Sequence, residues 1–92
     1  MKINFYATLR DIVGRKTVEV PIDHSVTIRQ LMEQLVTQFP DLREKLIDSN
    51  GEFYGYVHFL VNGRDHIYLP GKMDAVLTEN DTVSIFPAVG GG

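Results

Sequence analysis

The sequence predicts an α+β roll, in which a mixed sheet of four to five strands packs against one main helix. Segments with the period-two alternation of half-buried strands stand on both sides of a longer stretch with helical periodicity. The chain has 92 residues, of which 43% are hydrophobic and 23% charged, which is enough for one hydrophobic core. We therefore expect one domain at residues 1–87, followed by a flexible tail at residues 88–92.

The first two strands are expected at residues 2–8 and 16–23, where apolar side chains alternate with mostly polar ones. Residues 9–15, between these strands, have the composition of a turn with a short helical stretch that ends at Gly14. Two alternating segments so close in the sequence predict a hairpin.

The main helix is expected within residues 26–40, "VTIRQLMEQLVTQFP". Thr27 and Gln30 have the spacing of a capping box at its start, and Pro40 stops it because the residue before a proline is pushed out of the helical region. A short second helix is expected at residues 41–47. The apolar residues that recur at helical spacing are Ile28, Leu31, Met32, Leu35, Val36 and Phe39.

The C-terminal half is expected to complete the sheet. Residues 54–71 contain two strands around a type I′ turn at Asn62 and Gly63. Residues 71–81 show no clear periodicity, and we expect an irregular crossing segment there. Residues 81–87 alternate again and predict the last strand.

The inward positions of these elements form the expected core, and the outward face of the sheet has nothing left in the chain to cover it. Tyr6 and Phe86 are expected on that outward face, close together if the first and last strands are neighbours. A contiguous exposed apolar patch marks a partner site. The expected core residues are Ile3, Phe5, Val18, Val20, Leu31, Leu35, Val61, Leu77, Val83 and Ile85.

Composition excludes several classes of function. The chain has no cysteine, which excludes disulfides, thiolate zinc sites and a cysteine nucleophile. Its 9 basic and 12 acidic residues leave a net charge of −3, which argues against nucleic-acid binding. We find neither a signal peptide nor an apolar run long enough to span a bilayer, so we expect a cytoplasmic protein that does not bind membranes.

No catalytic constellation is visible in the interior of the sequence. His24, His58 and His66 are too scattered for a ligand pair on one element, so we expect surface or turn positions for them and no metal site. No glycine-rich loop precedes a helix, and no serine stands in a nucleophile motif.

The tail is the remaining candidate for chemistry. It ends on three consecutive glycines, and the six residues from Pro87 to Gly92 can reach about 20 Å from the folded body. A frayed end is the simpler explanation. Glycines without side chains, however, fit a channel that excludes other residues, and they would carry the terminal carboxylate of Gly92 to a reaction centre.

Four segments make the chain resemble a known family. "FYATLRDIVG", "VTIRQLMEQL", "LVNGR" and "VSIFPAVGGG" are similar to the ubiquitin-like sulfur carriers of the MoaD/ThiS family, which have a β-grasp fold. The resemblance covers the whole chain and is closest to the small subunit of molybdopterin synthase. Two positions depart from the family pattern: Gly90, where another small residue is usual, and Asn80, where glycine is common.

The resemblance implies a function for the tail. An E1-like enzyme with ATP would adenylate Gly92, and a persulfide donor would convert the glycyl-AMP to a thiocarboxylate. The large subunit of molybdopterin synthase would accept the tail and move the sulfur onto a pyranopterin, which binds molybdenum or tungsten. By itself the chain would be a sulfur-donating subunit, without catalysis and without a bound cofactor. The partner-binding residues that the resemblance implies are Tyr6, Phe86, Pro87, Val89, Gly90 and Gly91, with a third apolar docking position near Ile67 or Leu69.

Other functions stay open at this point. A protein modifier of the same fold would attach its terminal glycine to lysines, and a thiamine-pathway carrier would deliver sulfur to another acceptor. An interaction domain without chemistry would need only the folded body.

Overall fold

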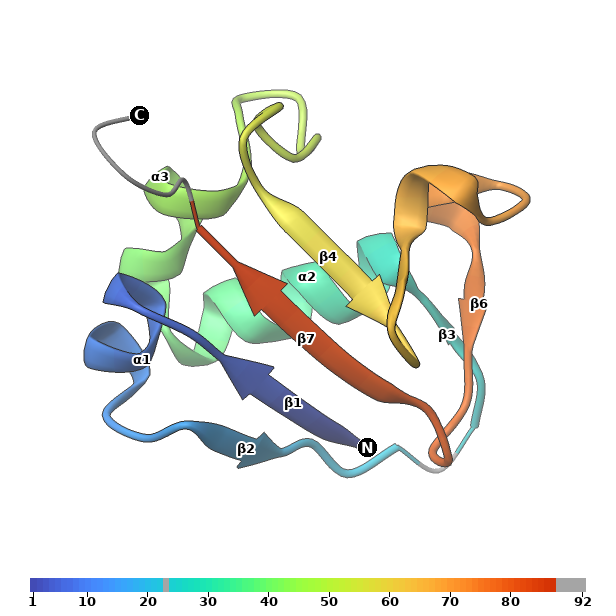
Figure 1. Ribbon diagram of the computed structural model, residues 1–92, viewed down its shortest axis with the longest axis horizontal. Helices are drawn as coiled ribbons and strands as arrows, with labels where there is room; N and C mark the ends of the chain where they lie inside the picture. Colours follow the sequence, from blue (N-terminus) through green and yellow to red (C-terminus); the bar gives the residue numbers. More distant parts are fainter. Residues whose placement is uncertain (23, 88–92) are drawn as a thin grey trace.

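The computed structural model describes residues 1–22 and 24–87. Its elements, in chain order, are β1 (Lys2–Phe5), α1 (Thr8–Val13), β2 (Thr17–Glu19), β3 (Val26–Thr27), α2 (Ile28–Gln38), η1 (Pro40–Leu42), α3 (Arg43–Leu46), β4 (His58–Val61), β5 (Arg64–Asp65), η2 (His66–Tyr68), η3 (Lys72–Asp74), β6 (Val76–Leu77) and β7 (Thr82–Phe86). The main sheet has five strands in the order β2-β1-β7-β4-β5 (Figure 1). Strands β3 and β6 form a second, two-stranded sheet.

At the centre of the main sheet, the first and last strands of the described chain lie side by side. Strand β1 pairs with β2 in an antiparallel hairpin and with β7 in parallel, so that Ile3 lies beside Val83 and Phe5 beside Ile85. Antiparallel pairing of β7 with β4 extends the sheet on the other side. The mixed sheet and the N-terminal hairpin predicted from the sequence are confirmed.

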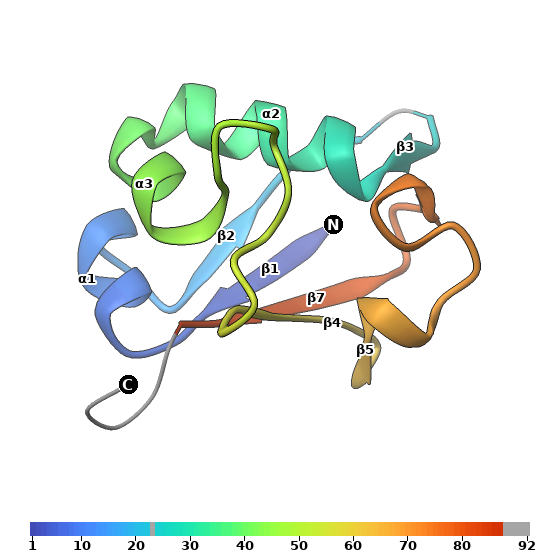
Figure 2. The ribbon, with the colours of Figure 1, turned by 90° about the horizontal axis from the view of Figure 1, so that it is seen from above.

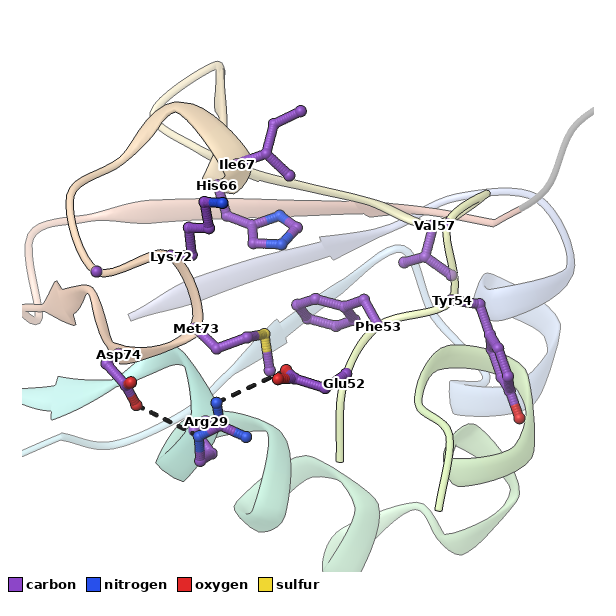
Figure 3. Close-up of a pocket in the computed structure, with 12 residues that line it drawn as sticks. Arg29, Glu52, Phe53, Tyr54, Val57, His66, Ile67, Lys72, Met73 and Asp74 are labelled. Carbon is purple, nitrogen blue, oxygen red and sulfur yellow. Dashed lines mark hydrogen bonds and ion pairs between the residues drawn. The ribbon is translucent and has the colours of Figure 1, made fainter. Parts of the chain in front are cut away.

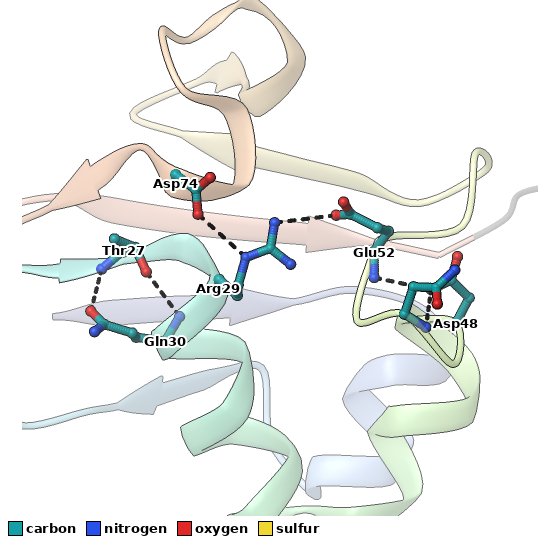
Figure 4. A network of polar contacts seen from close by, with 7 residues as sticks. Thr27, Arg29, Gln30, Asp48, Glu52 and Asp74 are labelled. Carbon is teal, nitrogen blue, oxygen red and sulfur yellow. Dashed lines mark hydrogen bonds and ion pairs between the residues drawn. The ribbon is translucent and has the colours of Figure 1, made fainter.

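Helix α2 begins and ends near the predicted residues. The side chain of Thr27 accepts a hydrogen bond from the backbone N–H of Gln30, and the Gln30 side chain accepts one from the N–H of Thr27 (Figure 4). This reciprocal pair is the predicted capping box, and it satisfies two backbone donors that a helix start leaves unpaired. The helix stops before Pro40, where the chain continues through η1 into the short α3.

The core fills the space between α2 and the sheet. Figure 2 shows α2 and α3 on the same side of β1, β7 and β4, and no helix of residues 1–22 and 24–87 on the other side of these strands. All ten residues predicted for the core are buried: Ile3, Phe5, Val18, Val20, Leu31, Leu35, Val61, Leu77, Val83 and Ile85. The α+β prediction is therefore confirmed together with the orientation of the helix.

The hairpin between β4 and β5 has the predicted turn but a shorter second strand. Asn62 and Gly63 have φ values of 53° and 87°, and two left-handed residues in succession are what a type I′ turn requires. Strand β5 stops after two residues, because the side chain of Asp65 accepts a hydrogen bond from the backbone N–H of Ile67 and so begins the η2 turn.

The expectation of an irregular crossing segment at residues 71–81 is wrong in one respect. The segment contains η3 and the strand β6, which pairs with β3 so that Val26 lies opposite Leu77. Strands of two residues each carry too little alternation for recognition in the sequence.

No helix in residues 1–22 and 24–87 is long and apolar enough to cross a bilayer.

Candidate docking face beside the C-terminal strand

Two aromatic rings meet on the uncovered face of the sheet. Because β1 and β7 are parallel neighbours, Tyr6 and Phe86 lie side by side at the ends of these strands. Their ring centroids are 4.2 Å apart and their planes differ by 9°, which is a stacked arrangement. Both side chains are half-buried. The predicted neighbourhood of the two rings is present, and their role in docking remains a proposal.

A lysine adds charge to one side of this ring pair. The ammonium group of Lys16 lies 5.6 Å from the ring centroid of Tyr6, within the range of a cation–π contact.

The residue after Tyr6 has an unusual backbone conformation. Ala7 has a φ of 54°, which residues with a side chain rarely adopt. Backbone strain of this kind is common at functional sites.

Strand β4 extends the face beyond Phe86 with two side chains that the sequence interpretation missed. His58 lies opposite Phe86 in the antiparallel register, and Leu60 lies opposite Ser84. His58 is exposed and Leu60 is half-buried. The docking face defined here therefore consists of Tyr6, Phe86, His58 and Leu60. The alternation in "VHFLV", with Phe59 and Val61 inward, was the signal that places His58 and Leu60 outward.

The carboxylate of Asp65 holds His58 in place. Its Oδ2 lies 3.1 Å from Nδ1 of His58, and its Oδ1 accepts the hydrogen bond from Ile67. Burial of the Asp65 carboxyl opposes ionisation, but the hydrogen bonds from His58 and Ile67 and the charges of His66 and His58 outweigh that cost, so the pKa of Asp65 lies below its usual value. Asp65 is thus a fixed negative charge at the edge of the docking face.

We expect a pH-dependent stability from this carboxylate. A depressed pKa in the folded state stabilises the fold above the usual aspartate pKa of about 4, and the gain is lost as the pH falls through the folded-state value. Asp65→Asn keeps an oxygen for the Ile67 bond but lacks the charge. Urea unfolding should therefore show the wild-type advantage over the variant shrinking below about pH 4. An advantage that stays constant across that range would contradict the assignment.

The other predicted site residues have different outcomes. Pro87 is buried at the end of the described chain. Val89, Gly90, Gly91 and Gly92 lie outside the described residues. The two positions considered for a third apolar docking residue lie in different surroundings, and their role in docking stays a prediction: Leu69 packs against the core, and Ile67 is exposed on η2.

The histidines lie at the predicted surface or turn positions. His24 and His58 are exposed, and His66 lies in the η2 turn, where its side chain is buried. Within residues 1–22 and 24–87 no group of histidines and carboxylates has a geometry that could hold a metal ion.

Comparisons with known proteins agree with this architecture. The model of the ThiS family matches residues 3–92. Small archaeal modifier protein 3 from Haloferax volcanii is 35% identical to the chain over 92 residues, which cover 100% of this chain and 98% of that protein. The sulfur carrier protein CysO from Mycobacterium tuberculosis is 30% identical over 81 residues, which cover 86% of this chain and 83% of CysO.

A solved structure shows the same fold. It is that of a Pyrococcus furiosus protein provisionally assigned as molybdopterin converting factor, subunit 1, and it superposes with a TM-score of 0.74 at 25% identity. The superposition covers 96% of this chain and 95% of the Pyrococcus chain.

Proposed function

Since the chain belongs to the ThiS family of ubiquitin-like sulfur carriers, we propose that it carries sulfur as a thiocarboxylate on Gly92 for the synthesis of molybdopterin. In this role it is the small subunit of a molybdopterin synthase. Its partners are the large subunit of that enzyme, an E1-like adenylating enzyme that uses ATP, and a persulfide donor. The proposed site of action is the cytoplasm.

The observation that carries the proposal is the position of the docking face relative to the tail. Phe86, stacked on Tyr6, is the last residue of β7. Six residues follow it in the sequence, and the sixth is Gly92. A partner that binds the docking face therefore holds the start of the tail. Six residues span at most about 20 Å, which is enough to enter an active site beside the bound face.

The chemistry follows from the reactivity of a carboxylate. A carboxylate is a poor electrophile, but its mixed anhydride with AMP has a good leaving group. The terminal sulfur of a persulfide displaces AMP, and reduction of the S–S bond by a thiol leaves the thiocarboxylate. This chain has no cysteine, so in our proposal the sulfur travels on the main chain. The covalent intermediates are glycyl-AMP and the thiocarboxylate.

A second function shares the first step. The similarity to Small archaeal modifier protein 3 favours a protein modifier, in which a lysine amine attacks the activated Gly92 and forms an isopeptide bond. Delivery of sulfur to thiamine or to another acceptor is a third possibility of the same kind. These functions differ in the acceptor and not in the activation of the tail.

The test is a reconstitution that offers both acceptors. The purified chain, an E1-like enzyme, ATP and a persulfide donor are incubated with the large subunit and its cyclic pterin precursor, and in parallel with a lysine-rich protein. Sulfurated pterin is the expected product. Isopeptide-linked products without pterin sulfuration would support the protein modifier instead. If neither product forms, both functions are contradicted.

Phe86→Ala should weaken docking without unfolding the domain. Because aromatic residues at the centre of an interface often contribute strongly, we expect binding to the large subunit to lose at least about 2 kcal/mol. Calorimetry measures this loss, and circular dichroism checks the fold. Tyr68→Ala is the matched control, since Tyr68 is 67% exposed and lies on η2 outside the docking face. Equal losses in both variants, or an unfolded Phe86→Ala, would refute the docking role.

A further inference from the structure

A pocket of about 340 Å³ lies between α2, the loop before β4 and the η2 and η3 turns. Figure 3 shows its residues, which come from α2, from the loop before β4 and from the η2 and η3 turns. None of them belongs to the docking face. Apolar side chains form much of its wall, namely Phe53, Val57, Ile67 and Met73. The volume is near the lower end of the range for small-molecule sites.

The first unusual group in this pocket is the imidazole of His66. Its side chain is only 9% exposed, and its ring meets Phe53 and Phe59 at centroid distances of 5.0 and 6.1 Å. Nδ1 is fully buried and has no hydrogen-bond partner among the described residues, because Asp65 Oδ1 is 3.2 Å away but outside the direction of a bond. The ring lines the pocket, and because Nδ1 is buried beside Asp65, the nitrogen that a ligand in the pocket could meet is Nε2.

The second unusual group is Lys72. Its backbone has a φ of 48° directly after Gly71 at 81°, so two residues in succession are left-handed. Glycine adopts this conformation freely, whereas a lysine adopts it at a cost that the surrounding structure has to offset. Nothing else in the turn needs a lysine, since its hydrogen bonds to Leu69 and Ala75 use the backbone alone. The side chain of Lys72 points toward His66 in Figure 3.

The charges of the pocket leave one cation without a partner. Arg29 pairs with Glu52 at 3.6 Å and with Asp74 at 3.3 Å, so both carboxylates of the lining are already shared by one guanidinium (Figure 4). Lys72 forms no ion pair with any residue in the described part of the chain. A ligand with one negative charge complements this lysine, whereas a second negative charge would face Glu52 and Asp74.

We propose that this pocket binds a small monocarboxylic acid with an apolar body. The carboxylate pairs with the ammonium group of Lys72 and accepts a hydrogen bond from the ring of His66 through Nε2. The apolar body lies against Phe53, Val57 and Met73. The proposal does not depend on the function of the tail, because the pocket and the docking face share no residue.

The test is an NMR titration of the isotope-labelled full chain with 3-methylbutanoate and, separately, with 3-methylbutanamide. The two probes have the same shape, but only the first carries a charge. We expect saturable shifts at Val57, Met73 and His66 with a millimolar Kd for the acid, as its small size dictates. The amide should bind at least about tenfold more weakly, because a hydrogen bond to a charged group is stronger than a neutral one.

Three variants separate the role of Lys72 from effects on the fold. Lys72→Met removes the charge and should abolish the preference for the acid, whereas Lys45→Met, on the exposed surface of α3, should leave it unchanged. Lys72→Gly should also lose the preference but unfold at a higher urea concentration, because glycine relieves the left-handed backbone. Absence of saturable shifts, equal affinity for acid and amide, or a preference that survives in Lys72→Met would each overturn the proposal.

Discussion

Deletion of Gly91 and Gly92 is expected to abolish sulfur transfer while leaving the fold intact. Glycine has no side chain that could pack into the core, so thermal stability should barely change. The shortened tail falls about 7 Å short of its former reach. A misplacement of 1 Å can cost about a hundredfold in rate, so pterin sulfuration should fall by at least that factor.

The matched variant lengthens the tail instead of shortening it. One residue added after Gly92 moves the activated carboxylate onto the wrong residue, and we expect a loss of the same order. Pterin sulfuration at the native rate by the shortened chain would show that the glycines have no part in the chemistry.

Leu35→Ala should cost about 2–5 kcal/mol of the free energy of unfolding. Leu35 is fully buried on the face of α2 that covers the sheet, so the truncation removes apolar contacts and leaves a cavity. A small domain has only about 5–15 kcal/mol in total, so the variant loses a large part of its stability. Urea unfolding followed by circular dichroism measures the change.

The control for Leu35→Ala lies on the same helix. Gln34 is exposed, so Gln34→Ala should change the stability by no more than about 0.5 kcal/mol. A cost of that size for Leu35→Ala as well would mean that the opposite face of α2 is buried.

The parts of the fold that could be predicted are those with strong local signals. Helix α2 combines apolar periodicity, a capping box at Thr27 and a proline stop, and all three agree with one another. Asn62 and Gly63 define their turn because few residues accept left-handed geometry. The position of Gly14 after α1, with a φ of 83°, has the same cause.

The missed features depend on contacts between distant segments. Strands β3 and β6 pair across about fifty residues of sequence, and neither has a pattern of its own. His66 is buried because Phe53 and Phe59 pack against it, and single histidines give no periodic signal. Strand β5 is short for a local reason, since Asp65 caps the η2 turn. Aspartate is frequent in turns and loops of many kinds, so its presence in the sequence did not predict this cap.

The sequence predicts those residues of the docking face that follow from the alternation of inward and outward side chains along a strand. The alternation of a half-buried strand places both Tyr6 and Phe86 on the outward face. The parallel pairing of β1 with β7 then brings the two rings into contact. His58 and Leu60 obey the same alternation. Their place in the docking face became visible only with the register of β4 on β7, which no local pattern contains.

The central claim, that Gly92 carries the sulfur, is tested most directly by the mass of the intact chain. The chain is incubated with ATP, an E1-like adenylating enzyme and a persulfide donor, reduced, and measured by mass spectrometry with fragmentation of the C-terminal peptide. We predict a mass increase equal to the difference between sulfur and oxygen, located on Gly92 and dependent on ATP. An unchanged mass, or sulfur located on any other residue, would contradict the claim.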